Sequence, residues 1–366
     1  MKQAYDIVIL GLSITSSWGN GHATTWRSLV KGLSARGRRV LFLEREQPWY
    51  AGNRDLADFP YCDVRLYSSL QDLREQYSTS VGEAGAVIVG SYVPDGIDVS
   101  AWVLQTAGGV CAFYDIDTPV TVAALERGDC AYLTAGLVPE FAVYMSFTAG
   151  PVLQQLQTRF GARRALPLYC SVDVDEYRPL AQPINVDLGY MGTYSADRQP
   201  KLRALLLDPA RELTKQRFVV AGAQYPREIV WPGNVRHVEH LPPAEHRQFY
   251  GTQRFTLNLT RADMVATGYS PSVRLFEAAA CGVPIISDEW PGLTEMFQVD
   301  DEILVARESS DVVDILQNVS EARRSRLAAA ARHRVLTGHS GVHRALELET
   351  HLESAREHRS SRVVTA

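Results

Sequence analysis

The stretch 267–295, TGYSPSVRLFEAAACGVPIISDEWPGLTE, decides the fold because it places a loop, a helix and a strand in close succession. Ser270 is a good N-cap residue, and Pro271 suits the first helical position, where its missing N–H costs no hydrogen bond. The sequence predicts a helix over 272–281. Gly282 and Pro284 end this helix and lead into a strand over 283–287.

The start of this helix is a candidate site for a diphosphate. Free N–H groups and the positive end of the helix dipole attract anions there, and Ser270 and Ser272 lie beside them. Arg274, one turn in, would add a charge-assisted hydrogen bond, and Glu277 on the same face would accept from two ribose hydroxyls. The simpler alternatives are a surface partner role for Arg274 and a solvated helix glutamate for Glu277.

Outward from this stretch, the first half of the chain alternates strands with helices. Continuous apolar runs at 6–11, 40–43, 86–89 and 110–114 are typical of buried parallel strands. Trp26, Leu29, Val30 and Leu33 recur with helical spacing, and Gly37 is placed to end that helix in a left-handed cap. The pattern predicts a doubly wound α/β domain.

The same alternation restarts near residue 185, with strands at 185–191, 217–221, 255–259 and 283–287 and helices at 198–207 and from 321. A polar stretch at 171–179 ends in a proline and separates the two halves. We expect a first domain at 1–171, a second at 172–335, and a C-terminal helix at 336–366 that packs back on the first domain and frays after Glu357.

Composition limits the function classes. The chain has 366 residues, 46% of them apolar, and a net charge of −5, so no basic field attracts nucleic acid or an anionic membrane. No apolar run reaches the length of a membrane span, and no signal-peptide pattern opens the chain. Its five cysteines are scattered, which argues against disulfides and zinc. These features predict a cytoplasmic protein; they leave the oligomeric state open.

The string 274–297, RLFEAAACGVPIISDEWPGLTEMF, is similar to the nucleotide-binding segment of GT-B glycosyltransferases, and most like the CgeB-like (spore-maturation type) group. The segments 147–179 and 189–202 resemble that family's interdomain region and the start of its second domain. The resemblance implies two Rossmann-like doubly wound domains facing a central cleft, with Glu277 on the ribose and Arg274 on the diphosphate. Retaining members often carry a glutamate where this chain has Tyr269, so donor sugar and stereochemical outcome stay open.

The resemblance also implies donor contacts in two loops. One follows the strand 185–191, where backbone amides and hydroxyls can hold phosphate; the alternative is an ordinary turn capped by Ser195 or Asp197. The other follows a short strand near 237 and would seat the nucleobase. The residues concerned are Gly192, Thr193, Tyr194, Arg198, His240 and Leu241.

The loop 13–25, SITSSWGNGHATT, is the acceptor-side candidate of the first domain. Trp18, Gly19, Asn20 and Gly21 form its centre, and the glycines permit close backbone approach. His22 near the helix start is a candidate base or partner of the departing phosphate; the alternative is a capping role. The glycine spacing is not that of a dinucleotide fingerprint unless Glu44 is taken as its ribose acid, so a dehydrogenase is a minor alternative.

Asp115 and Asp117 at the end of a first-domain strand are the other base candidates. Alternate residues of a strand project to the same side, so both would face the cleft; the alternative is that Asp117 caps the next helix. Trp18, Trp49 and Tyr50 form either an aromatic acceptor wall or part of the core.

Together these features predict a metal-independent glycosyltransferase of the hexosyltransferase type. It would move a sugar from a nucleoside diphosphate sugar to an acceptor hydroxyl or similar nucleophile, with UDP, dTDP or GDP as the open choices of nucleotide. No cofactor and no metal are expected. Two rival functions use the same architecture: a nucleotide-sugar epimerase, and a nucleotide-sugar-binding assembly factor with little turnover.

Overall fold

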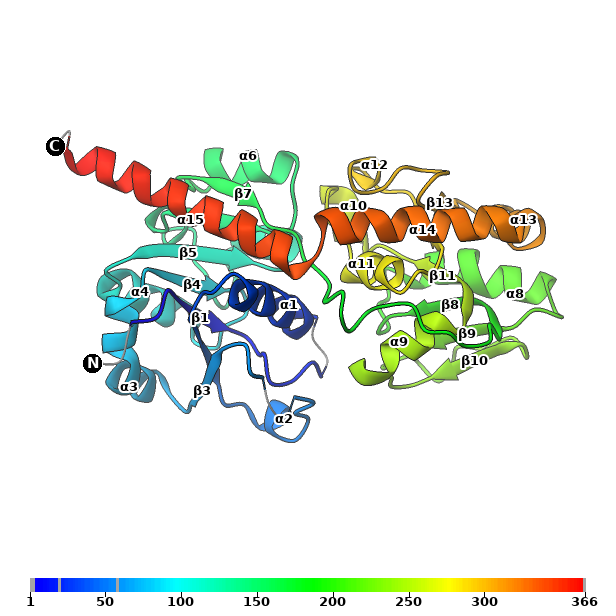
Figure 1. Cartoon of the computed structure of the whole chain (residues 1–366), viewed down its shortest axis with the longest axis horizontal. Coiled ribbons are helices and arrows are strands. Elements are labelled where there is room, and N and C mark those ends of the chain that lie inside the picture. The colour runs from blue at the N-terminus through cyan, green and yellow to red at the C-terminus, as the bar shows by residue number, and fades with distance from the viewer. Residues whose placement is uncertain (1–3, 19–20, 57–58, 365–366) are drawn as a thin grey trace. The chain divides into compact units, whose positions relative to one another are not determined.

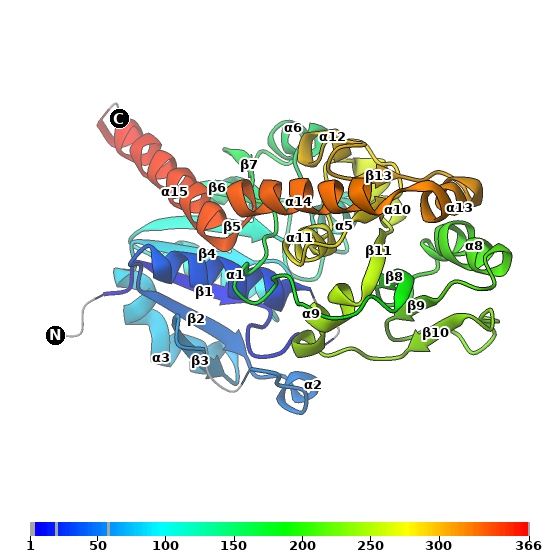
Figure 2. The same cartoon turned by 45° about the vertical axis from the view of Figure 1, so that its right-hand side comes forward.

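A computed structural model describes residues 4–18, 21–56 and 59–364, with side chains through residue 357. The chain divides into two compact units. Unit 1 comprises Met1–Ser171 and Gly341–Ala366, and unit 2 comprises Val172–Ser340. Figures 1 and 2 show the elements of each unit.

Unit 1 is built on a seven-stranded parallel sheet with the order β3-β2-β1-β4-β5-β6-β7. Its strands are β1 Ile7–Gly11, β2 Val40–Arg45, β3 Asp63–Tyr67, β4 Ala86–Gly90, β5 Val110–Asp115, β6 Val143–Ser146 and β7 Ala165–Pro167. Its helices are α1 His22–Ala35, α2 Pro48–Ala51, α3 Leu70–Glu83, α4 Gly96–Thr106, α5 Thr118–Arg127, the 3₁₀ turn Val138–Glu140, α6 Pro151–Thr158 and α15 Gly341–Val364.

Alternate residues of β1 enter two apolar layers. Ile7 and Ile9 pack with residues of α1 and α15, whereas Val8 and Leu10 pack with residues of α3 and α4. All five residues of β1 are buried, which is why the sequence reads as a continuous apolar run. The predicted stripe of α1 is buried, and Gly37 has the left-handed φ of 79° expected of it.

Helix α15 completes unit 1 from the far end of the chain. It packs against α1, β5 and β6, and a Cβ on Gly32 of α1 would lie 2.1 Å from the carbonyl oxygen of Gly341. The two helices therefore approach closely where glycines face each other. The helix is described through Val364, and the fraying expected of the last residues stays a prediction.

Unit 2 has a six-stranded parallel sheet with the order β10-β9-β8-β11-β12-β13. Its strands are β8 Val186–Met191, β9 Phe218–Ala221, β10 Val235–Val238, β11 Gln253–Asn258, β12 Ile285–Ser287 and β13 Leu304–Val305. Its helices are α7 Gln199–Leu202, a π-helical turn Arg203–Leu207, α8 Asp208–Glu212, α9 Pro243–Gly251, α10 Ala262–Thr267, α11 Val273–Ala280, α12 Leu293–Met296, α13 Ser309–Asn318 and α14 Glu321–Gly338.

The helical segment after β8 and the end of unit 2 differ from the sequence prediction. The helical segment predicted over 198–207 continues to Glu212 and contains a π turn. The hydrogen-bond pattern shifts at this turn because Pro209 has no N–H to donate to the carbonyl of Leu205. The unit also ends at Ser340 rather than at 335, since α14 is unbroken to Gly338.

Candidate functional site

The order of the strands in unit 2 reverses at one place. From β8, the sheet continues through β9 and β10 on one side and through β11, β12 and β13 on the other. The loops after β8 and β11 therefore leave opposite faces of the sheet at the same edge. In doubly wound sheets, ligands bind at the carboxyl ends of the strands where the order reverses.

Two arginines lie near each other at this edge. Arg198 follows β8, and Arg274 lies in the first turn of α11 with its guanidinium 5.6 Å from the ring centre of Tyr190. Burial, and then the positive charge of Arg274, lower the pKa of Arg198. Among the described residues, Arg198 Nε and Arg274 Nη1 are buried without a hydrogen-bond partner. Like charges with unused donors form a site that an anion would stabilise.

The loop after β8 is fixed beside these arginines. Gly192 N–H donates to the carbonyl of Ala221 (2.8 Å), and Tyr194 N–H donates to that of Ala223 (2.9 Å). Arg198 Nη2 donates to the carbonyl of Thr193 (2.6 Å). A Cβ at position 192 would lie 2.4 Å from the hydroxyl oxygen of Tyr190, so a larger residue here would force the buried Tyr190 ring to move.

The alternative of an ordinary capped turn is not what the structure shows. The N-cap of α7 is Arg198, with no side-chain capping bond. Asp197 instead accepts from the backbone N–H of Ala262 at 2.8 Å, and Ser195 donates to Asp197. These contacts tie the loop after β8 to the loop after β11.

Helix α11 begins later than predicted. Ser272 has an extended backbone and is the N-cap of the helix, and its hydroxyl accepts from Arg274 N–H at 3.4 Å. Ser270 is buried and donates to the carbonyl of Gly268 at 2.9 Å. The assignment of Ser270 as N-cap and Pro271 as first helical residue is therefore wrong by two positions. Arg274 consequently lies at the helix start.

Tyr269 has a left-handed backbone, with φ of 52°. Its N–H donates to the carbonyl of Pro291 at 2.7 Å, and a Cβ on Gly292 would lie 2.6 Å from its ring. Non-glycine residues in this region cost free energy and persist where the surroundings hold them. The strained loop before α11 is thus braced by the turn that precedes α12.

Glu277 is buried, with 2% of its surface exposed. The hydroxyl of Tyr250 donates to its Oε2 at 3.0 Å. Burial, and then the charge of the Glu277 carboxylate, raise the pKa of the neighbouring Tyr177 well above its usual value. The alternative of a solvated helix glutamate is therefore wrong. A carboxylate held by one phenol keeps lone pairs with which to accept further hydroxyls.

The predicted nucleobase loop follows β10. His240 is exposed and Leu241 is half-buried. The carbonyl of Leu241 lies 3.2 Å from Nε2 of His246 on α9. This contact fixes the loop to the helix that also carries Tyr250.

A half-buried ion pair at the same edge was not predicted. Lys201 of α7 pairs with Asp288 after β12, and Asp288 Oδ1 accepts from Thr260 N–H (3.1 Å) and hydroxyl (2.9 Å). Burial raises the pKa of Asp288, against the opposing effect of Lys201. The pair joins α7 to the ends of β11 and β12. The only sequence signal for this pair is that Asp288 directly follows a strand.

In unit 1, His22 is the first residue of α1, and burial lowers its pKa to about 4. Among the described residues, its Nδ1 is buried without a partner. The ring of Tyr92 meets it edge-on, with centroids 5.5 Å apart, and the hydroxyl of Tyr92 donates to Asp117 Oδ2 at 3.0 Å. Tyr92 has a left-handed φ of 61°. It is not among the predicted site residues, because no local sequence pattern marks a strained backbone.

Asp115 does not present its carboxylate as predicted. It is fully buried and accepts from Tyr144 (2.6 Å), Thr121 (2.8 Å) and the N–H of Asp117 (3.1 Å). Burial raises its pKa to about 6. Strand β5 ends at Asp115, so the alternation argument does not extend to Asp117. Asp117 is the N-cap residue of α5 but makes no side-chain capping bond.

Gly19 and Asn20 of the acceptor-side loop lie outside the described residues, and Gly21 is the N-cap of α1. Trp18 and Trp49 are 47% and 51% exposed, so the core alternative is wrong for both. Tyr50 is buried.

Glu44 also has a clear role. It accepts from Ile14 N–H at 2.7 Å, from Thr15 N–H and hydroxyl, and from Ser13. It anchors the loop after β1, and both of its oxygens are occupied. This arrangement does not favour Glu44 as a dinucleotide ribose acid.

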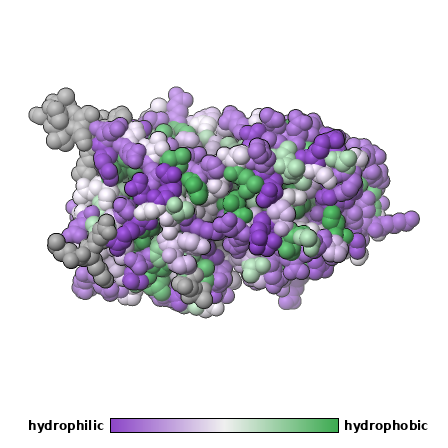
Figure 3. All heavy atoms as spheres, viewed as in Figure 1, coloured by the Kyte–Doolittle hydropathy of each residue, from purple (hydrophilic) through white to green (hydrophobic). Residues whose placement is uncertain are grey.

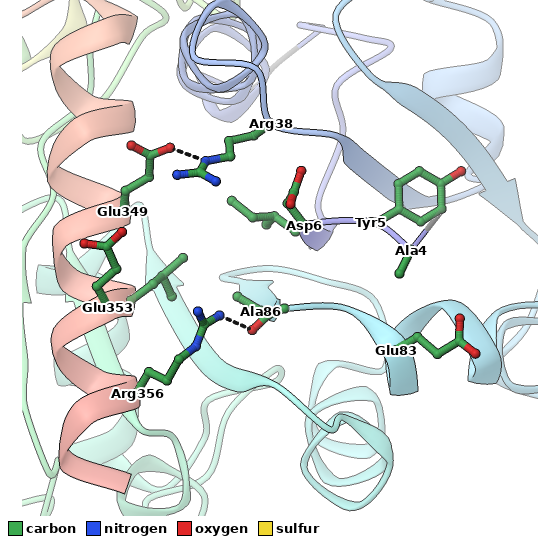
Figure 4. A pocket seen from close by; sticks show the side chains of 12 residues that line it. Ala4, Tyr5, Asp6, Arg38, Glu83, Ala86, Glu349, Glu353 and Arg356 are labelled. Atoms are coloured by element: carbon green, nitrogen blue, oxygen red, sulfur yellow. Dashed lines mark hydrogen bonds and ion pairs between the residues drawn. The ribbon is translucent and has the colours of Figure 1, made fainter. Parts of the chain in front are cut away.

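A pocket of about 400 Å³ lies at the opposite edge of the same sheet, near the starts of β1 and β4. Figure 4 shows Arg38 directed at Glu349, and Arg356 directed at the backbone beside Ala86, where it donates to the carbonyl of Gly85. These contacts hold α15 to the sheet. We assign the pocket no part in the candidate site.

Two searches covered only the described part of the chain. There, no three His, Cys, Asp or Glu side chains are grouped so as to hold a metal ion. Nor does that part contain a helix long and apolar enough to cross a bilayer. Figure 3 shows hydrophilic and hydrophobic residues interspersed over the visible face.

Part of the chain is similar to a known protein family. Residues 198–350 match the model of the glycosyl transferase-like family. No curated protein sequence matches the chain.

Similar solved structures extend over nearly the whole chain. Sucrose-phosphate synthase from Thermosynechococcus elongatus is 13% identical with a TM-score of 0.66, covering 94% of this chain and 98% of its own. Anabaena HepE in complex with UDP and glucose is 12% identical with a TM-score of 0.69, covering 96% and 100%. An alpha-glucosyltransferase in complex with UDP is 11% identical with a TM-score of 0.71, covering 96% and 100%. The chain thus has the GT-B fold of two Rossmann-like units, and the family match with these neighbours supports a glycosyltransferase.

Proposed function

We propose that this protein is a metal-independent glycosyltransferase that moves a hexosyl unit from a nucleoside diphosphate sugar to an acceptor hydroxyl or similar nucleophile. The observation that supports it most is the pair of buried donors, Arg198 Nε and Arg274 Nη1, which have no partner among the described residues. A buried donor without a partner costs about 1–3 kcal/mol. The two phosphates of a nucleotide sugar would satisfy both donors.

Unit 2 would bind the donor. The diphosphate lies at the start of α11 and the loop after β8, the ribose hydroxyls donate to Glu277, and the nucleobase meets the loop at His240 and Leu241. As the bond between the anomeric carbon and the phosphate oxygen breaks, Arg274 and the N–H groups of α11 stabilise the charge that develops on the diphosphate. UDP is the first nucleotide to test, because the HepE and alpha-glucosyltransferase neighbours were solved with it.

Unit 1 would supply the acceptor-side groups. His22 is neutral at neutral pH because its pKa is about 4, so its imidazole can accept a hydrogen bond from an acceptor hydroxyl or from the departing diphosphate. Asp117, held by Tyr92, is the second candidate base. Asp115 is given a supporting role, because its buried carboxylate holds the backbone of Asp117.

The finer assignments are also part of this proposal. The CgeB-like subgroup, cytoplasmic location and the exclusion of nucleic acid rest on the sequence arguments above. One alpha-glucosyltransferase neighbour was solved with a 13-mer DNA, so a DNA duplex should be included among the acceptors tested.

Calorimetric titration of UDP, dTDP, GDP and NAD tests the donor site. We expect one nucleoside diphosphate to bind at micromolar strength, about −8 kcal/mol. Arg274→Ala should weaken binding at least tenfold, since one charge-assisted hydrogen bond and its charge are lost, and Glu277→Gln should weaken it as well. Arg307→Ala is the matched control, because Arg307 is exposed and paired with Glu289. If only NAD binds, or nothing binds, the proposal is wrong.

Product analysis of the nucleotide sugar separates transfer from its rivals. A transferase consumes the donor and labels an acceptor, an epimerase converts the donor with no acceptor present, and a binding factor leaves it unchanged. Activity should persist after chelation with EDTA; its loss and recovery with added Mn²⁺ or Mg²⁺ would contradict metal independence.

A further inference from the structure

Three aromatic side chains, none of them a predicted site residue, gather beside the loop after β8. Trp231 stacks on His237, with ring centroids 4.8 Å apart and an angle of 14° between the planes. Tyr225 meets both rings edge-on, at 5.4 Å and 5.2 Å. It also meets the ring of Tyr194, in the loop itself, at 5.6 Å. The cluster therefore connects the segment between β9 and β10 to the loop after β8.

Backbone contacts join the loops after β8 and β9 as well. Gly192 N–H donates to the carbonyl of Ala221 at 2.8 Å, and Tyr194 N–H donates to that of Ala223 at 2.9 Å. Between these two bonds, a Cβ on Gly222 would lie 2.0 Å from the carbonyl oxygen of Gly192. Because that contact is with backbone, only glycine at position 222 lets the two loops lie so close together.

The hydroxyl of Tyr225 holds one peptide group of the loop after β8. It donates to the carbonyl of Gly192 at 3.0 Å. Burial raises the pKa of Tyr225 above the ordinary 10.0, so the hydroxyl keeps its hydrogen at neutral pH. The carbonyl of Gly192 and the N–H of Thr193 belong to one planar trans peptide, in which the two groups point in opposite directions. The bond from Tyr225 therefore fixes the direction of the Thr193 N–H as well.

The N–H of Thr193 is an unused donor. Among the described residues no atom accepts a hydrogen bond from it, whereas the N–H groups on either side, of Gly192 and Tyr194, are occupied. The carbonyl of Thr193 accepts from Arg198 Nη2 at 2.6 Å, and Arg198 Nε is one of the two buried donors that lack a partner in that part of the chain. Thr193 therefore offers a free N–H and, through its carbonyl, holds a guanidinium with an unused donor.

We propose that Tyr225 is a positioning residue of the donor site. Its hydroxyl holds the Gly192–Thr193 peptide, so the Thr193 N–H and the Arg198 guanidinium keep their places for the phosphates of the nucleotide sugar. The stacked tryptophan and histidine rings fix the phenol that carries this hydroxyl. The inference rests on the proposed function, which places the diphosphate at this loop. Tyr225 acts through the loop and needs no contact with the ligand.

Tyr225→Phe tests the inference, because it keeps the ring in the cluster and removes only the hydroxyl. Calorimetric titration uses UDP, dTDP and GDP. The nucleotide that the intact protein binds should bind the variant about three- to tenfold more weakly, the effect of one hydrogen bond. Hydrogen exchange of the free variant should be faster at 192–194 and unchanged in β9, because the loop loosens while the sheet stays intact. A protein that is merely destabilised would exchange faster in both places.

Tyr114→Phe is the matched control, because the Tyr114 hydroxyl likewise donates to a backbone carbonyl, that of Leu168 at 2.9 Å, but in unit 1. This variant should bind the nucleotide as tightly as the intact protein does. Unchanged affinity or unchanged exchange at 192–194 in Tyr225→Phe would overturn the inference, and so would an equal loss of affinity in Tyr114→Phe. No binding of any of the three nucleotides by the intact protein would instead overturn the proposed function.

Discussion

At the scale of single residues, unit 1 holds two buried groups whose ionisation is displaced in opposite directions. Burial lowers the pKa of His22 to about 4 from an ordinary 6.5, so the native protein resists protonation there. Burial raises the pKa of Asp115 to about 6 from 3.8, so the native protein holds a proton there longer than the unfolded chain does. Both groups disfavour charge because they are buried, and neither forms an ion pair within the part of the chain that the structure describes.

These shifts predict opposing effects on stability between about pH 4 and 6. The contribution of His22 is complete above its unfolded pKa and is lost as the pH falls towards 4. That of Asp115 is complete below its unfolded pKa and is lost as the pH rises through 6. Urea unfolding across this range should therefore show a free energy of unfolding that falls more steeply with rising pH in His22→Gln than in the intact protein.

Asp115→Asn should change the slope in the other direction, because only the His22 contribution remains. An exposed pair serves as the control: Arg127→Gln removes a partner of Asp129 at the surface and should leave the slope unchanged. Parallel curves for all four proteins would show that neither buried group controls stability here.

At the scale of elements, helix α15 is a structural part of unit 1 although it comes from the end of the chain. Its buried residues Ala345, Leu348, Leu352 and Ala355 join the same apolar layer as Ile7 and Ile9 of β1. Arg36 and Arg38 beside α1 pair with Glu349, whose side chain is 7% exposed. The helix therefore holds the sheet through both apolar contacts and charge.

Leu348→Ala should lower the free energy of unfolding by about 2–5 kcal/mol, because it leaves a cavity in this layer. Leu346→Ala, two residues away on the same helix, should change it by less than about 0.5 kcal/mol, because Leu346 is 49% exposed. Chemical unfolding of the two variants provides the comparison. Equal losses would mean that α15 does not pack through Leu348.

At the scale of the whole molecule, the proposed function assigns different tasks to the two units. The groups that would bind the nucleotide all lie in unit 2, between Val172 and Ser340, and they come from three separate segments of its chain, 192–198, 240–241 and 269–277. The candidate acceptor-side groups all lie in unit 1. A ligand that binds native unit 2 stabilises that unit by mass action.

Hydrogen exchange with and without saturating UDP checks this division. We expect UDP to slow exchange in the loop after β8 (192–198) and in the segment 268–277, because backbone N–H groups there would contact phosphate. The loop after β1 in unit 1 should exchange at the same rate in both states. Protection limited to unit 1 would show that the nucleotide binds unit 1 and would contradict the proposed donor site.

The sequence by itself determined the fold class, most of the strands and the two arginines, because these depend on local patterns. Continuous apolar runs mark parallel strands buried on both faces, and serine and proline before an apolar helix mark its start to within two residues. Arg198 follows a strand, and Arg274 and Glu277 lie on one helix, so their place at the candidate binding edge follows from topology.

Only the tertiary structure decided which side chains meet. Tyr250 is far from Glu277 in sequence, and the Lys201–Asp288 pair joins elements 87 positions apart, so no spacing rule reveals them. The burial of Asp115 could not be inferred either, because its partners Thr121 and Tyr144 come from different elements. A sequence pattern records how one segment repeats along itself, whereas burial and hydrogen bonding depend on which segments the folded chain brings together.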